Sequence, residues 1–163
     1  MKIGIFSDVH DNLSNLEKAL NLFRENDINT LIFCGDFCSP IPARDIGKYK
    51  GQVHCVFGNG DGDRFTISNF AKNEFPNLIL HGEYAELDID DVKIAVTHYP
   101  FYGMALASTG KYNAVFSGHT HEVYKERIGK CLFANPGEVL GAFGVPTCAI
   151  YDTLSNDIEI YNL

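Results

Sequence analysis

The segment KIGIFSDVH, residues 2–10, places a polar motif directly after a short apolar run, and this stretch decides the fold. Residues 2–6 have the character of a buried strand. A helix should follow, because apolar residues then recur on one helical face at Leu13, Leu16, Leu20 and Phe23. Ser14 and Glu17 have the spacing of a capping box at the start of this helix.

Two further strands are expected over residues 31–34 and 53–57, with a helix between them from about residue 42 to residue 49. This alternation of strands and helices predicts parallel strands that are joined by right-handed crossovers.

The second half of the chain is richer in strands. The runs at 78–80, 84–89 and 92–97 follow one another through short turns, as antiparallel strands would. A helical stretch is expected around residues 104–111, followed by strands at 114–116, 123–128, 131–134, 147–151 and 157–161. So many strands for so few helices predict two packed sheets with helices outside, in one domain spanning residues 1–163.

Composition excludes several classes of protein. The net charge of −8 and pI near 5.1 argue against a duplex-binding protein, so no stable nucleic-acid complex is expected. Residues 2–6 leave no room for a leader, and no apolar run approaches the about 20 residues of a membrane span. We therefore expect a cytoplasmic protein without membrane association. The five cysteines predict free thiols, and the spacing of Cys34 and Cys38 is not that of a redox Cys-x-x-Cys motif.

Polar side chains follow the predicted strands at equivalent places, and these strand ends should meet at one sheet edge. The residues are of the types Asp, His and Asn, with no Cys among them: Asp8, His10, Asp36, Asn59, His98, His119 and His121. Seven such ligands are too many for one tetrahedral zinc and fit two divalent ions that share a ligand. Manganese, nickel, iron, cobalt and zinc all suit this mixed set of oxygen and nitrogen ligands.

Each motif alone has an ordinary structural interpretation. Gly-Asp is a common turn, Asn59 could occupy a left-handed position, and His98 could be a hydrogen-bonded core histidine. The ordered set favours metal binding, whereas His54 and His81 lie outside it and are expected to be structural. In an extended Gly118-His119-Thr120-His121 segment, the two imidazoles would point the same way and reach neighbouring metals.

The chain resembles the calcineurin-like metallophosphoesterases, in particular the small prokaryotic phosphodiesterases. The resemblance extends from residue 3 to residue 138 and rests on five motifs in the family's order: Asp8-Val9-His10, Gly35-Asp36, Gly58-Asn59-Gly60-Asp61, Thr97-His98 and Gly118-His119-Thr120-His121. It implies an α/β (α+β) fold, a four-layer αββα sandwich of two mixed β-sheets flanked by helices.

The resemblance also implies residue roles. Asp8, His10 and His121 would hold one metal, Asn59, His98 and His119 the other, and Asp36 would bridge them. Asp36, Asn59 and His98 are the expected catalytic residues, and Asn12 and Asn59 the expected contacts to substrate phosphate. The implied function is a dinuclear metal-dependent phosphodiesterase, in which a metal-bridging hydroxide attacks a small phosphate ester.

Alternatives remain at this point, and the chain departs from the family at two places. The alternatives are a phosphomonoesterase and a non-catalytic protein-binding scaffold similar to the retromer subunit; a homodimer is left open. Many members have a histidine, credited with protonating the leaving group, where this chain has Gly60. Tyr99-Pro100 stands where relatives often have Gly-His, and should reshape the mouth of the cleft.

Overall fold

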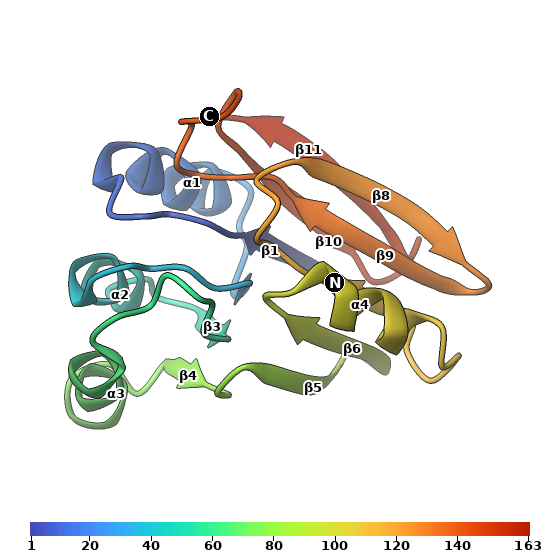
Figure 1. Cartoon of the computed structure of the whole chain (residues 1–163), viewed down its shortest axis with the longest axis horizontal. Coiled ribbons are helices and arrows are strands. Elements are labelled where there is room, and N and C mark those ends of the chain that lie inside the picture. The colour runs from blue at the N-terminus through green and yellow to red at the C-terminus, as the bar shows by residue number, and fades with distance from the viewer.

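Eleven strands and four helices form two packed β-sheets with helices on both outer faces (Figure 1). The computed structural model describes every residue from 1 to 163. The elements in chain order are β1 (Lys2–Phe6), α1 (Leu13–Glu25), β2 (Thr30–Phe33), α2 (Pro40–Gly47), β3 (Gln52–Cys55), α3 (Arg64–Asn73), β4 (Leu78–Leu80), β5 (Tyr84–Ile89), β6 (Val92–Thr97), α4 (Pro100–Ala107), β7 (Ala114–Phe116), β8 (Val123–Ile128), β9 (Cys131–Pro136), β10 (Thr147–Asp152) and β11 (Asp157–Asn162).

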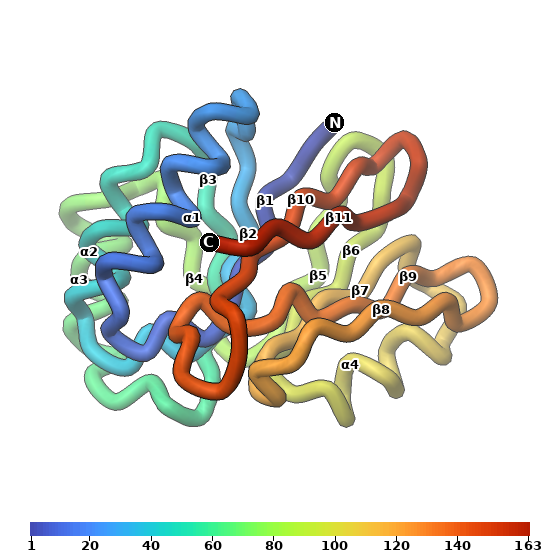
Figure 2. Tube along the Cα trace, turned by 90° about the horizontal axis from the view of Figure 1, so that it is seen from above, coloured from blue at the N-terminus to red at the C-terminus, as the bar shows by residue number.

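The first sheet has the strand order β11-β10-β1-β2-β3-β4. Strands β1 to β4 are parallel, as the alternation of strands and helices predicts, and β10 and β11 join antiparallel at the other edge. Helices α1, α2 and α3 cover its outer face (Figure 2). The apolar stripe of α1 packs there in a core with Phe6, Leu31 and Phe33.

The second sheet has the order β5-β6-β7-β9-β8 and is also mixed. Its inner face packs on the first sheet through a core that includes Ile5, Ile32, Val96 and Phe116. Helix α4 lies on its outer face, over β6, β7 and β9, at the lower right of Figure 2. Three cores thus separate four layers, and the predicted αββα sandwich of two mixed sheets is confirmed.

Two local predictions are wrong. Strand β4 was expected to pair antiparallel with the strands that follow it, but it adds parallel to β3. The short connection at Gly82, with φ of 82°, then carries the chain into the other sheet. Helix α1 is capped by Asn12, whose side chain accepts a hydrogen bond from the Asn15 backbone N–H, and not by Ser14.

The remaining differences concern helices. Helix α3 was not predicted, because it buries only Ile67 and therefore carries little apolar periodicity. Helices α2 and α4 begin at Pro40 and Pro100, about two and four residues before the predicted starts, since proline suits the first helical turn. All five cysteines are free, as expected. None of the helices combines the length and the apolar character that crossing a membrane requires.

Candidate metal centre

The seven predicted ligand residues come together in loops that follow β1, β2, β3, β6 and β7. Two overlapping groups have ligand atoms within 4.8 Å of one another: Asp8, His10 and His121 form one, and Asp8, Asp36 and His98 form the other. Asp36, a member of the second group, links it to the first, since its Oδ2 is 3.4 Å from the Nε2 atoms of both His10 and His98. The predicted ligand residues therefore lie close together, as expected. Asp8 belongs to both groups, so it is a second candidate, beside Asp36, for a ligand shared by two ions.

The first group fits a bound cation because its inward-facing atoms have no other partner. Asp8 Oδ1 lies 3.7 Å from His10 Nε2 and 3.5 Å from His121 Nε2, which is outside hydrogen-bonding distance. Both Asp8 Oδ1 and His10 Nε2 are buried and make no hydrogen bond. Buried polar atoms are almost always paired, so unpaired atoms of this kind that face one point suit a metal ion.

A further cluster, which shares Asp36 and His98 with the second group, is assembled around Asn59. Its Oδ1 lies 3.1 Å from His98 Nε2 and 2.8 Å from His119 Nδ1. Asp36 Oδ2 approaches the same His98 nitrogen at 3.4 Å. One carboxylate, one amide and two imidazoles thus converge on a second point beside the first.

The other ring nitrogen of three histidines is held by a protein partner. Nδ1 of His98 lies 2.8 Å from the Cys34 carbonyl oxygen, Nδ1 of His121 lies 2.7 Å from Glu138, and Nδ1 of His10 lies 3.1 Å from Cys38 Sγ. Such contacts fix the ring orientation and leave Nε2 facing the site, as in metal-binding histidines generally.

Glu138 and Asp61 are supporting residues to which the sequence reasoning gave no role. Glu138 is almost fully buried, and besides His121 it accepts hydrogen bonds from the backbone N–H groups of Phe143 and Gly144. Asp61 accepts hydrogen bonds from the backbone N–H groups of Asp36, Cys38 and Gly58. Asp61 lies within the Gly58-Asn59-Gly60-Asp61 motif, whereas Glu138 lies 17 residues from His121 and next to no ligand motif.

Five ligand residues adopt left-handed backbone conformations, with φ between 42° and 74°: Asp8, His10, Asp36, His119 and His121. Strained positions of this kind cost roughly 1–3 kcal/mol each and cluster at functional sites. The expectation that residues 118–121 are extended is wrong, since both histidines are left-handed. Their rings nevertheless reach different partners, His119 toward Asn59 and His121 toward Asp8.

The glycines before the ligand residues allow close approach of neighbouring groups more than they supply unusual φ values. A Cβ added to Gly58 would lie 2.1 Å from Asp36 Oδ1, and one added to Gly118 would lie 2.0 Å from Ser7 Oγ. Gly35 alone among the four motif glycines has a positive φ, of 102°. The loops therefore pack too tightly around the carboxylates for a larger residue.

The mutual proximity of acids and imidazoles shifts their pKa values. Burial acts to raise the pKa of Asp36, but the neighbouring His98 and a hydrogen bond from the Gly60 N–H outweigh it and lower the pKa. The pKa of His10 is raised, chiefly by Asp8. Burial raises the pKa of Asp61. The centre therefore favours a charged Asp36 carboxylate beside imidazoles, whereas burial shifts Asp61 in the opposite direction.

The remaining candidate residues are placed differently. Asn12 caps α1 and donates its amide to the Leu140 carbonyl, so both ends of its side chain have partners within the protein. His54 and His81 pair with each other at 3.0 Å, as expected for structural residues. Tyr99 stands beside the centre, with its ring centroid 5.3 Å from that of His98 and 5.5 Å from that of His119.

Comparison with known proteins agrees with this geometry. A family model described as the calcineurin-like phosphoesterase superfamily domain matches residues 1–156. The chain is 37% identical over 157 residues to phosphodiesterase MJ0936 of Methanocaldococcus jannaschii, which covers 94% of this chain and 93% of that protein. The solved structure of an archaeal phosphodiesterase matches with a TM-score of 0.93 and 34% identity, over 100% of both chains.

A more distant structural match is vacuolar protein sorting 29 from Cryptosporidium parvum, with a TM-score of 0.70 and 20% identity over 98% of this chain and 95% of that one. At this identity the match shows a shared fold only. Because the family model spans nearly the whole chain and the archaeal relative is similar over the same length, the chain belongs to the calcineurin-like phosphoesterase superfamily, as its five motifs predict.

Proposed function

We propose that this chain, as a single domain over residues 1–163, hydrolyses small phosphodiesters with the help of two divalent metal ions. The observation that carries the proposal is the convergence of two overlapping ligand groups, in which Asp8 Oδ1 and His10 Nε2 are buried and make no hydrogen bond. Two ions side by side are the arrangement that clamps the attacking and leaving oxygens of an in-line phosphoryl displacement.

Similarity to known proteins identifies the class of enzyme. The chain is a phosphodiesterase, because a phosphodiesterase relative matches nearly all of it and the family model is that of a phosphoesterase. Membership in this superfamily also implies divalent metal cofactors. Manganese, nickel, iron, cobalt and zinc are the proposed candidates, since all accept mixed oxygen and nitrogen ligands.

The proposed ligand sets follow the first group and the cluster around Asn59. Asp8, His10 and His121 would hold one ion, and Asn59, His98 and His119 the other, with Asp36 between them. Two divalent ions held there would lower the pKa of bound water and neutralise negative charge on a phosphoryl group. They would also make the centre attractive to an anion in a protein of net charge −8.

The protein's own groups would orient the substrate. Asn59 directs its Oδ1 toward His98 and His119, so its NH₂ group is the one that can donate to a phosphoryl oxygen. His98 is fully buried and fixed by the Cys34 carbonyl, which keeps its Nε2 beside Asp36. Asn12 could contact the substrate only if its side-chain NH₂ group released the Leu140 carbonyl oxygen when the substrate binds.

A protein-binding scaffold has less support than an enzyme, because none of the seven ligand positions is replaced. A redox role for Cys34 and Cys38 is also disfavoured. Cys34 is buried, its carbonyl faces His98, and the Cys38 thiol lies against His10, so both residues serve the metal centre.

The test combines metal analysis with hydrolysis of an activated phosphodiester, using the wild type and Asp36→Asn. Asp88→Asn is the matched control, because it makes the same change in charge on an exposed strand residue. We expect two metal equivalents in the wild type and control, and loss of activity in Asp36→Asn. A wild type without metal-dependent turnover, in any of the five metals, would reject the proposal.

A further inference from the structure

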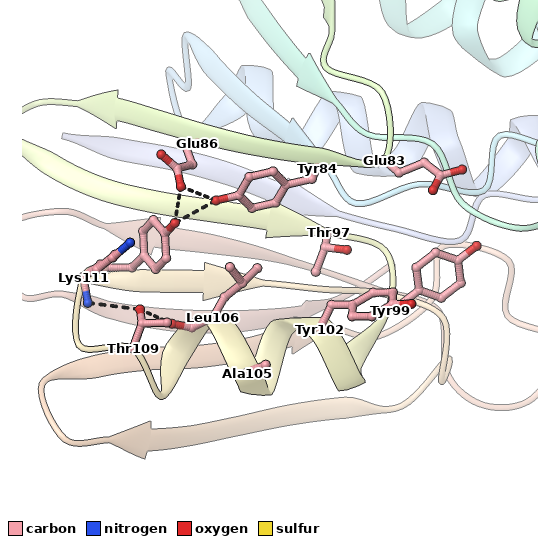
Figure 3. A pocket seen from close by; sticks show the side chains of 11 residues that line it. Glu83, Tyr84, Glu86, Thr97, Tyr99, Tyr102, Ala105, Leu106, Thr109 and Lys111 are labelled. Carbon is pink, nitrogen blue, oxygen red and sulfur yellow. Dashed lines mark hydrogen bonds between the residues drawn. The ribbon is translucent and has the colours of Figure 1, made fainter.

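A cavity of about 600 Å³ lies between helix α4 and strand β5, on the outer face of the second sheet. Tyrosines dominate its lining, namely Tyr84, Tyr99, Tyr102 and Tyr112, and Leu106 supplies an apolar wall. In Figure 3, Tyr99 and Glu83 stand at one end of the cavity, and Tyr84, Glu86 and Lys111 at the other. The volume is in the range of roughly 300–1,000 Å³ that is typical of small-molecule sites.

The cavity opens beside the metal centre. Tyr99 follows His98 directly in the chain, and its ring lies 5.5 Å from that of His119. On its other side, the Tyr99 ring lies 5.8 Å from the Tyr102 ring, at an interplanar angle of 87°. Only the Tyr99 ring therefore separates a group bound against Tyr102 from the ligand histidines. One substrate molecule could place this group in the cavity and its phosphorus atom at the metal centre.

The lining favours a planar ring. Tyr102 is 57% exposed and Tyr84 is 39% exposed, so their faces are free to stack on a ligand. Aromatic side chains of this kind stack on nucleobases in a manner that tolerates different bases. The far end adds a polar contact, because Glu86 accepts hydrogen bonds from the hydroxyl groups of both Tyr84 and Tyr112 and its carboxylate remains exposed.

The charges in the cavity favour a neutral ring that carries N–H donors. Glu86 stands at the far end and Glu83 at the mouth, where Glu83 pairs with Arg64 at 2.9 Å. Lys111 lines the same end as Glu86, so the two carboxylates are balanced by Lys111 and Arg64, and the cavity carries no excess positive charge that would call for a second phosphate. The carboxylates accept hydrogen bonds from the exocyclic amino and ring N–H groups that nucleobases present.

We propose that this tyrosine-lined cavity is the subsite for a nucleobase, so that the substrate is a phosphodiester with a nucleoside on one side. The assignment rests on the proposed phosphodiesterase function, and it gives that function a substrate class. Tyr102 and Tyr84 would stack on the base, and Glu86 would accept its N–H groups.

The first test measures binding and needs no metal and no turnover. Adenosine is titrated into the full chain and followed by NMR. We expect saturable shifts confined to α4, β5 and Tyr112. Tyr102→Ala should weaken binding roughly tenfold or more, as loss of one stacking ring does, and Tyr102→Phe should restore it. Tyr124→Ala is the matched control, since Tyr124 packs on Phe133 away from this cavity.

The second test compares two phosphodiesters with the same 4-nitrophenyl leaving group, of which one carries adenosine and the other a methyl group. We expect the kcat/KM ratio to favour the adenosine ester by roughly tenfold or more, and Tyr102→Ala to lower that ratio. Equal rates for both esters, or adenosine shifts outside the cavity, would overturn the subsite while leaving the phosphodiesterase intact. Failure to hydrolyse either ester would instead count against the proposed function, and the adenosine titration would still decide the subsite.

Discussion

Replacement of Glu138 by glutamine should weaken one metal site and spare the other. In the wild type, one carboxylate oxygen of Glu138 faces His121 Nδ1 at 2.7 Å, and the other accepts backbone N–H groups of Phe143 and Gly144 at 2.8 and 2.9 Å. Glutamine has nearly the same shape but only one acceptor oxygen, so it cannot satisfy both sides. Glu138 is only 1% exposed, and water therefore cannot replace the lost partner.

The size of the effect follows from the histidine tautomer. If the amide oxygen stays with the two backbone groups, the NH₂ group faces Nδ1 of His121 and forces the proton onto Nε2, the nitrogen that faces Asp8. A protonated Nε2 cannot bind a metal. Loss of such a supporting residue typically weakens metal affinity roughly 10- to 100-fold, which corresponds to about 1.4 to 2.7 kcal/mol.

Calorimetric titration of the metal-free protein with manganese measures both sites in one experiment. We expect the ion at Asp8, His10 and His121 to bind more weakly in Glu138→Gln and the ion near Asn59 to bind as in the wild type. Glu122→Gln is the matched control, because Glu122 is an exposed glutamate next to the same histidine. Wild-type affinity at both sites of Glu138→Gln would refute the reasoning.

Three further outcomes are expected. Because Gly60 cannot donate a proton, kcat for phosphodiesters should fall steeply as the pKa of the leaving group rises, and a flat dependence across substituted phenols and alkyl alcohols would contradict this. Gly118→Ala should destabilise the protein by about 1–3 kcal/mol in urea unfolding, because its Cβ would lie 2.0 Å from Ser7 Oγ, whereas Gly144→Ala, with open space around it, should change little. Burial lowers the pKa of His54 to about 4, below its ordinary value of 6.5, so the unfolded chain takes up the proton first and stability should fall as pH drops from 6.5 toward 4. His54→Gln should show a smaller loss of stability between pH 7 and pH 5, and an equal loss would argue against this origin.

The ligand residues could be predicted because their signal is local. Each ligand motif follows a short apolar run of the length and composition of a strand. The end of the strand and the polar residues after it can therefore be located from neighbouring residues alone. The two-sheet architecture followed from the excess of strands over helices. The αββα layering itself came from the family resemblance, and the three separate cores bear it out.

The supporting residues could not be predicted because their contacts join distant parts of the chain. Glu138 meets His121 across 17 residues, and Asp61 meets the Asp36 backbone across 25. Strand β4 was assigned to the wrong neighbour for the same reason, because sequence proximity favoured β5 while pairing with β3 was set by packing. Helix α3 buries one residue, and a helix with so small a buried face has almost no periodic signal.

The left-handed ligand residues explain why such supports are required. Five strained positions, at roughly 1–3 kcal/mol each, would not persist unless neighbouring groups held them. The loops are joined by backbone hydrogen bonds, from the N–H groups of Val9 and His10 to the Asp36 carbonyl and from Leu140 to the Asp8 carbonyl. Asp61 adds three more hydrogen bonds beside Asp36. The protein therefore holds its ligand atoms in place through its own hydrogen bonds, so loss of a single histidine should cost one ion and not the arrangement of the whole centre.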